Sequence, residues 1–256
     1  MLRFATFLSP ALYETYAYIS SYVGEQVGRA AQLAVGQSLD EFADGRAHIG
    51  FLCGLPYSQA ARRDDPAIEL LAAPVLYPPR YHGKPVYFSD IIVRSSISFT
   101  SFEDLQGTVW GYNEKTSHSG WNIVSYNLAM RGKTLDYFGR LVKTGSHLRS
   151  IEMVLQGDID AAAIDSHVLD VLRMRDARLA TNLRIIDALG PSPIPPIVAA
   201  KSLPASLKQE LKRILLAMHH DADAAEALRQ GLIARFVPIS DEDYRPVHDM
   251  SVKAVG

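Results

Sequence analysis

The sequence predicts an α/β protein of two lobes, each a mixed, mostly parallel sheet flanked by helices. Short apolar strand segments alternate with amphipathic helix segments along most of the chain, which is typical of sheets with helical crossovers. The 256 residues suffice for two lobes of ordinary size. The segment 190–196 holds four prolines, so it cannot be helical and suits a stiff strand crossing between lobes.

The first third of the chain supplies the start of lobe one. Its strands are short apolar runs, and its helices have apolar residues three or four positions apart or a capping residue at the start. Ser38 and Glu41, for example, form a capping box. The expected strands are 2–7, 33–35, 48–53 and 69–76, and the expected helices are 11–28, 38–45 and 57–63.

The middle of the chain repeats the pattern, and the tail is mainly helical. The expected strands are 86–94, 108–112, 139–143, 159–164 and 183–186, and the expected helices are 101–106, 121–130, 147–156, 166–180, 204–219 and 222–231. The last segment, 236–255, is expected to be irregular with room for one helix. Lobe one is therefore predicted to contain residues 1–88 and 192–256, and lobe two residues 89–191. Two crossing strands, near 86–94 and 194–199, would join them.

Composition argues against several classes of protein. The formal net charge is −2 and no basic stripe is present, so nucleic acid is not an expected partner. No apolar run approaches the roughly 18 residues of a membrane span. Cys53 is the single cysteine and is interpreted as a small buried hydrophobe. Motifs for a nucleophile elbow or a phosphate loop are missing, so nothing supports nucleotide hydrolysis. His82 and His118 have no partners at zinc-site spacing. We expect no catalytic residue, metal or cofactor.

The run Thr116–Trp121 carries the strongest functional signal. It follows an apolar strand and opens an amphipathic helix. The first N–H groups of a helix lack internal partners and carry partial positive charge, so added hydroxyls can complete an oxyanion site. Ordinary N-capping is the competing explanation. A cap needs one hydroxyl, however, and three occur here within four residues.

Four segments in this order resemble one family. They are 44–51 (DGRAHIGF), 86–93 (VYFSDIIV), 117–121 (SHSGW) and 144–147 (TGSH), the last followed after a helix by 157–162 (GDIDAA). Over residues 2–217 the chain is similar to the phosphonate/phosphate-binding subfamily of ABC-transporter solute-binding proteins. The resemblance implies the type 2 periplasmic-binding-protein fold, with hinge closure of the two lobes around a ligand.

The resemblance also implies an anion site. In the family the helix start binds the phosphonate oxygens, a histidine after the next strand donates to the same group, and an aromatic residue of the crossing strand reaches the ligand. The positions that match here, with one neighbouring hydroxyl, are Thr116, Ser117, His118, Ser119, His147 and Tyr87.

Departures from the family pattern bear on the ligand. Leu52 stands where the family has a tyrosine contact. His167 and Pro195 stand where members that bind an aminoalkyl phosphonate use two acidic residues. Asp165 can still reach the site. We therefore expect a phosphate- or phosphonate-like ligand without an amine.

Lobe one offers two further candidates. Ser9 and Tyr13 follow the first strand, and ligands of such sheets bind at the carboxyl ends of strands. Core packing competes with ligand contact for Tyr13.

The predicted function is the solute-binding component of an ABC transport system, a monomer that delivers an oxyanion to a permease. The alternatives are a cytoplasmic enzyme on the same fold, similar to thiamine-pyrimidine synthases or dehydratases of chorismate derivatives, and a ligand sensor. A periplasmic location is expected if a leader was removed. No signal peptide is visible at the N-terminus, so a cytoplasmic location stays open.

Overall fold

The computed structural model describes residues 1–254, which fall into two compact units. Unit 1 contains Met1–Val86 and Pro193–Arg245, and unit 2 contains Tyr87–Ser192 and the tail from Pro246. The chain therefore passes between the units three times, whereas the sequence predicted two crossings and a tail wholly in lobe one. Residues 255 and 256, which that tail included, lie outside the described residues.

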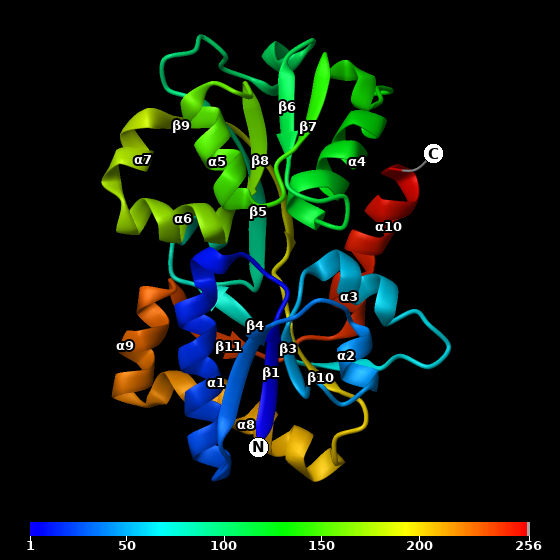
Figure 1. The fold of residues 1–256 in the computed structure, drawn as a ribbon, viewed down its shortest axis with the longest axis vertical. Coiled ribbons are helices and arrows are strands. Elements are labelled where there is room, and N and C mark those ends of the chain that lie inside the picture. The colour runs from blue at the N-terminus through cyan, green and yellow to red at the C-terminus, as the bar shows by residue number, and fades with distance from the viewer. Residues whose placement is uncertain (255–256) are drawn as a thin grey trace. The chain divides into compact units, whose positions relative to one another are not determined.

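Unit 1 is built on a mixed sheet in the order β11-β4-β10-β3-β1-β2 (Figure 1). β1 pairs in parallel with β2 and β3, whereas β10 runs antiparallel to β3 and β4, and β11 antiparallel to β4. The antiparallel pairs form where the chain returns from unit 2. The strands are β1 (Leu2–Thr6), β2 (Ala31–Val35), β3 (Ile49–Phe51), β4 (Ile68–Leu76), β10 (Ile197–Ala200) and β11 (Ile233–Val237).

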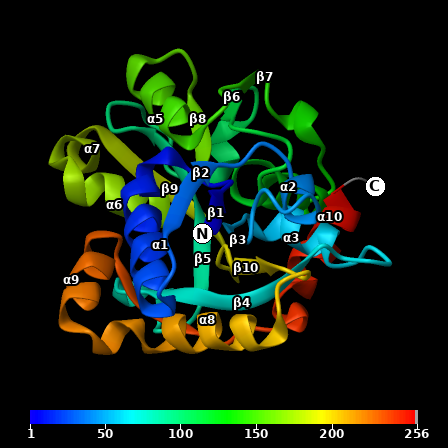
Figure 2. The same ribbon diagram turned by 60° about the horizontal axis from the view of Figure 1, so that its bottom comes forward.

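Helices cover both faces of this sheet. α1 stacks Tyr16 on Phe51 of β3, with ring centroids 4.3 Å apart. Figure 2 shows α8 running along β4, which it contacts. On the other face Phe42, Tyr57 and Tyr244 form a buried apolar cluster. The helices of unit 1 are α1 (Tyr13–Val27), α2 (Asp40–Ala43), α3 (Gly54–Ala60), α8 (Ala205–Ala217) and α9 (Ala222–Gln230).

Unit 2 holds the second sheet, in the order β7-β6-β8-β5-β9. β6 pairs in parallel with β7 and β8, and β5 runs antiparallel to β8. The strands are β5 (Val86–Arg94), β6 (Val109–Tyr112), β7 (Arg140–Lys143), β8 (Ala161–Asp165) and β9 (Leu183–Pro193). The helices are α4 (Ile123–Met130), α5 (His147–Gln156), α6 (Ser166–Arg175), α7 (Ala177–Asn182) and α10 (Arg245–Ala254).

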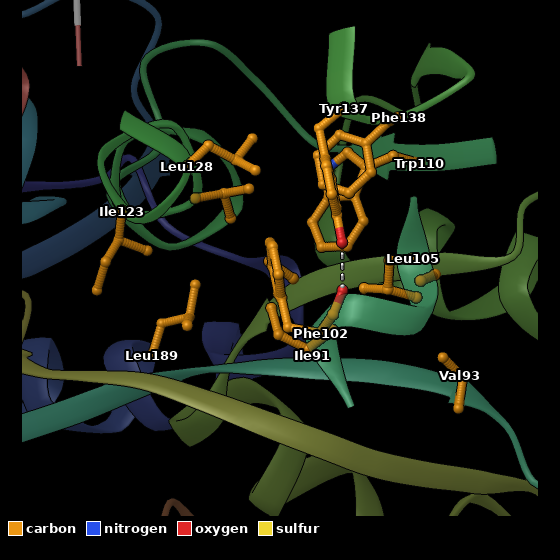
Figure 3. Close-up of a cluster of buried hydrophobic side chains, with 13 residues drawn as sticks. Ile91, Val93, Phe102, Leu105, Trp110, Ile123, Leu128, Tyr137, Phe138 and Leu189 are labelled. Carbon is orange, nitrogen blue, oxygen red and sulfur yellow. Dashed lines mark hydrogen bonds between the residues drawn. The ribbon is translucent and has the colours of Figure 1, made fainter. Parts of the chain in front are cut away.

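Alternation along the central strands of unit 2 sends side chains to two cores. Ile91 and Val93 pack in one cluster with residues of α4, and Ile92 packs in the other with residues of α5 and α6. Figure 3 shows the first cluster, in which the Tyr137 hydroxyl donates to the Phe102 carbonyl oxygen at 3.2 Å. This alternation also decides which polar residues of the strands point towards α4.

Most of the expected elements are present, several with shifted ends, and three differences are larger. The helix expected over 166–180 is two helices, because the Asp176 side chain accepts from Arg178 N–H and caps α7. The strand expected at 183–186 continues through the prolines to Pro193. The segment expected to be irregular from 236 overlaps β11, and α10 is the one helix for which it had room.

Candidate functional site

The run Thr116–Trp121 forms the turn between β6 and α4. One π-helical turn, His118–Asn122, precedes α4, and Asn122 N–H donates to the Ser117 carbonyl oxygen at 3.1 Å. Ser117 Oγ accepts from Gly120 N–H at 3.0 Å and caps the helix. The backbone N–H groups of His118 and Ser119 have no partner within the helix, because they belong to its first turn. Turns of this type are frequent at functional sites.

Gly120 allows Asn113 to approach the turn closely. A Cβ at position 120 would collide with Asn113 Oδ1. That buried oxygen makes no hydrogen bond within the described residues, while Asn113 Nδ2 lies 3.4 Å from His147 Nε2. Asn113 is therefore a site residue that the sequence did not indicate. The one sequence feature that could have identified Asn113 is its position, because it directly follows a strand and precedes the hydroxyl run.

His147 begins α5, beside the turn. Ser146 caps α5 by accepting from Arg149 N–H at 3.1 Å. The Nε2 atom of His147 lies 3.1 Å from Ser119 Oγ, and its buried Nδ1 has no hydrogen-bond partner among residues 1–254. Burial lowers the pKa of His147 to about 4, so the ring is neutral at neutral pH. Asn113, Ser117, Ser119 and His147 together form what we call the polar cluster.

The side chain of His118 is directed away from the polar cluster. It is 1% exposed, its Nε2 lies 2.8 Å from Ser192 Oγ, and its Nδ1 lies 2.9 Å from Asn122 Nδ2. Burial lowers the pKa of His118 to about 4. Tyr87 is also buried, with its ring 6.3 Å from that of His118. Ligand contact by His118 stays a prediction, and only the backbone N–H group of this residue is placed to make it.

Asp165 lies at the end of β8 and caps α6. Its Oδ1 accepts from His167 N–H at 2.9 Å and from Val168 N–H at 3.3 Å. Asp165 pairs across the sheet with Ser89, whose hydroxyl donates to the Ser119 carbonyl oxygen at 2.5 Å. Cross-strand partners share a face, so the Asp165 side chain is on the α4 side of the sheet. Burial, and then the charge of Asp90, raises its pKa to about 7 against the effect of the cap bonds.

The other predicted residues fall in separate places. Thr116 is exposed, next to the cap residue Ser117. Ser9 and Tyr13 belong to unit 1: the Ser9 hydroxyl accepts from Ala11 N–H at 3.4 Å, and the Tyr13 hydroxyl donates to the Leu33 carbonyl oxygen at 3.3 Å. Ligand contact by these three residues stays a prediction.

Three further observations concern a cavity, metal ligands and membrane spans. A cavity of about 600 Å³ in unit 2 is lined by residues that include Arg94, Asp176 and Arg178, and by none of the predicted site residues. Within residues 1–254 no three His, Cys, Asp or Glu side chains gather in a way that could hold a metal ion. In the same range no helix combines the length and apolarity of a membrane span.

Comparison with known protein families decides the class of the protein. The family model described as "ABC transporter, phosphonate, periplasmic substrate-binding protein" matches residues 4–244. The chain belongs to this family. It is thus a substrate-binding protein of the phosphonate ABC-transporter type, which confirms the resemblance found in the sequence. The family is one of transport binding proteins and not of enzymes.

Solved structures show the same fold at low sequence identity. A binding protein component of an ABC phosphonate transporter from Pseudomonas aeruginosa has a TM-score of 0.86 at 18% identity, covering 99% of this chain and 86% of that chain. PhnD1 from Prochlorococcus marinus, in complex with methylphosphonate, has a TM-score of 0.85 at 17% identity, covering 98% and 97%. The aliphatic sulphonate binding protein SsuA from Escherichia coli has a TM-score of 0.61 at 13% identity, covering 98% and 85%. The predicted type 2 periplasmic-binding-protein fold is confirmed.

Proposed function

We propose that this substrate-binding protein holds the head of a phosphate- or phosphonate-type ligand at the polar cluster of unit 2, and that the ligand carries no amine. The observation that supports this most directly is the 3.1 Å approach of Ser119 Oγ to His147 Nε2, beside helix-start amides that have no partner within the helix. Hydroxyls, an imidazole and helix N–H groups are donors that suit an oxyanion.

The neutrality of His147 without ligand fits reversible binding. A ring whose pKa is lowered to about 4 places no fixed positive charge in the cluster at neutral pH. An oxyanion beside the ring favours its protonated form, because opposite charges a few ångströms apart stabilise each other. The histidine thus adds charge when the ligand is present, and releasing the anion does not leave a buried cation behind.

The residues at the positions expected to contact an amine do not suit an ammonium. His167 and Pro195 occupy the positions at which amine-binding relatives are expected to have acids, and His167 is buried. Asp165 uses Oδ1 to cap α6, and its raised pKa of about 7 makes it only partly ionised at neutral pH. An ammonium brought here would lack the two acidic side chains expected in amine-binding relatives, so it would lose hydration without full compensation.

The setting of the protein follows from its family. We propose that the loaded protein acts as a monomer in the periplasm and delivers its ligand to an ABC permease. Binding to reconstituted permease in the presence and absence of ligand would test the partner, and equilibrium ultracentrifugation the oligomeric state. Closure of the two lobes around the ligand stays a prediction, which a ligand-dependent radius of gyration in small-angle scattering would test.

Calorimetry tests the ligand class. Phosphate, phosphite, methylphosphonate and 2-aminoethylphosphonate are titrated into the protein, with sulfate and an aliphatic sulphonate as controls. We expect saturable heat with at least one of the first three and weaker binding of the aminoalkyl compound. Equal or tighter binding of 2-aminoethylphosphonate contradicts the amine prediction. No heat from any phosphorus oxyanion contradicts the proposed function.

A further inference from the structure

The three passages of the chain between the units have a common neighbour in unit 2. The passages fall between Val86 and Tyr87, between Ser192 and Pro193, and between Arg245 and Pro246. On the unit 2 side they lead into the start of β5, out of the end of β9 and into α10. Each of these three segments contacts the first turn of the helix that carries the hydroxyl run.

The contacts run through His118 and Asn122. The ring of Tyr87, the first residue of unit 2, lies 6.3 Å from the ring of His118. Ser192, at the second passage, has its Oγ 2.8 Å from His118 Nε2. At the third passage Asn122 Nδ2–H donates to the Val247 carbonyl oxygen at 3.3 Å, and the same amide nitrogen lies 2.9 Å from His118 Nδ1. Figure 1 shows α10 beside α4, in agreement with these contacts.

The network has one consistent assignment of protons. The Asn122 amide nitrogen is a donor only, so it donates to both Val247 and His118 Nδ1. The proton of the neutral ring is therefore on Nε2, which donates to Ser192 Oγ. His118, Asn122 and Ser192 are 1%, 4% and 2% exposed. Breaking any one bond would leave a buried polar group without a partner, and such a loss is costly, so the network favours a single geometry.

The oxyanion-binding side of the turn and this network share one stretch of backbone. Ser117 and Ser119, which belong to the polar cluster, flank His118 in the chain. The Ser89 hydroxyl of β5 donates to the Ser119 carbonyl oxygen at 2.5 Å. A shift of this backbone on binding must move the His118 ring or strain its bonds. Packed interiors transmit such shifts because they contain few voids.

We propose that His118 is a positioning residue that couples oxyanion binding at the turn to all three passages between the units. The inference rests on the proposed function. It adds the residues through which ligand binding at the turn affects the passages between the units. If His118 couples the two, loss of its hydrogen bonds must change the affinity for the oxyanion. Couplings of this kind commonly amount to between 5-fold and 150-fold.

Hydrogen-exchange mass spectrometry with and without methylphosphonate tests the coupling. In the wild type we expect the ligand to slow exchange at the turn (116–123) and at the three passages (86–89, 190–194 and 245–249). In His118→Leu, which fills the buried position with an apolar side chain and cuts both bonds, we expect slowing at the turn alone and an affinity roughly 10-fold lower. His118→Gln should restore both effects, because its amide oxygen can accept from Asn122 and its NH₂ group can donate to Ser192.

Matched serines separate coupling from packing. Ser192→Ala removes one arm of the network and should abolish ligand-induced slowing at 190–194. Ser125→Ala removes a buried hydroxyl of the same helix that has no hydrogen-bond partner among the described residues, and it should leave every difference unchanged.

Two results would overturn the inference alone. One is a His118→Leu protein whose passages respond to ligand as in the wild type. The other is a His118→Leu protein in which unit 2 exchanges faster without ligand but the ligand-induced differences are unchanged. That result would show that His118 only stabilises the structure. If the wild type binds none of phosphate, phosphite and methylphosphonate, the proposed function fails and the coupling fails with it.

Discussion

The hydroxyl of Ser119 lies 3.1 Å from Nε2 of His147, although one residue precedes α4 and the other begins α5. The reason is the parallel pairing of β6 with β7, in which Tyr112 is opposite Lys143. Both strands end at the same edge of the sheet, so the segments that follow them begin side by side. Two short polar motifs far apart in the sequence are thereby brought into one site.

The serines of the turn should separate binding from stability. Ser119→Ala should lower oxyanion affinity by about 1.5–3 kcal/mol, the typical value of a hydrogen bond to a charged group, with little change in melting temperature. Ser117→Ala should also lower affinity, and should cost about 1 kcal/mol of stability because Ser117 Oγ caps Gly120 N–H. Calorimetry and thermal unfolding measure the two effects.

A cap elsewhere in unit 2 provides the control for these variants. Ser101 caps the turn Phe102–Leu105 through a capping box with Asp104. Ser101→Ala should therefore reduce stability without changing affinity. Full retention of affinity in Ser119→Ala would remove that hydroxyl from the site.

Local signals in the sequence were enough for much of the fold and part of the site. The hydroxyl run and the start of α5 were found because helix caps and strand ends depend on neighbouring residues. β11 was not expected, because its pairing with β4 joins segments about 160 residues apart on either side of unit 2. Its own signal is short: Ile233 and Phe236 are buried, with charged Arg235 between them.

The direction of the His118 side chain could not be read from the sequence. A π-helical turn has one residue more than an α-helical turn, so its side chains point in different directions. Nothing in the run Thr116–Trp121 predicts such a turn. The partners of His118 also come from distant segments, Ser192 directly and Val247 through Asn122. Asn113 was missed for a related reason, since an amide after a strand is common in loops.

Gly120 should be needed for the shape of the site. A Cβ added at position 120 would collide with Asn113 Oδ1, so Gly120→Ala must displace Asn113 or open the turn. We expect a stability loss of about 1–3 kcal/mol, typical of overpacking, together with weaker oxyanion binding. Gly120→Ala combined with Asn113→Ala should recover part of the stability, since the smaller side chain relieves the collision. A single variant with wild-type stability and affinity would contradict this account.

Asp165 should make the protein less stable as pH rises. Its folded pKa is raised from 3.8 to about 7, so the folded state binds its proton more tightly than the unfolded state does. The contribution is fully present below pH 3.8 and is lost as pH rises towards 7. Asp165→Asn keeps an oxygen to cap α6, and above pH 7 it should be more stable than the wild type by up to roughly 4 kcal/mol, since one pKa unit corresponds to about 1.4 kcal/mol.

Oxyanion affinity offers a second measurement on Asp165. Removing a negative charge near the polar cluster should strengthen binding of methylphosphonate above pH 7. The control is Asp158→Asn, which removes an exposed carboxylate of the same unit and should change neither stability nor affinity. If Asp165→Asn and the wild type bind methylphosphonate with equal affinity, the charge of Asp165 does not affect binding at the polar cluster.

His147 should act in the opposite direction on acid stability. Its folded pKa is lowered from 6.5 to about 4, so the unfolded state binds the proton more tightly. The stabilising contribution is fully present above pH 6.5 and is lost as pH falls to about 4. One pKa unit corresponds to about 1.4 kcal/mol, so the whole window corresponds to roughly 3 kcal/mol. His147→Gln cannot titrate, and its stability should fall less over this range.

His118→Gln is the matched control, because it removes an equally buried histidine outside the polar cluster. A bound oxyanion stabilises the charged ring of His147, so the ligand should reduce the acid sensitivity of the wild type and of His118→Gln but not of His147→Gln. Urea unfolding at several pH values, with and without methylphosphonate, measures these differences, and an equal ligand effect in all three proteins would show that His147 does not sense the anion.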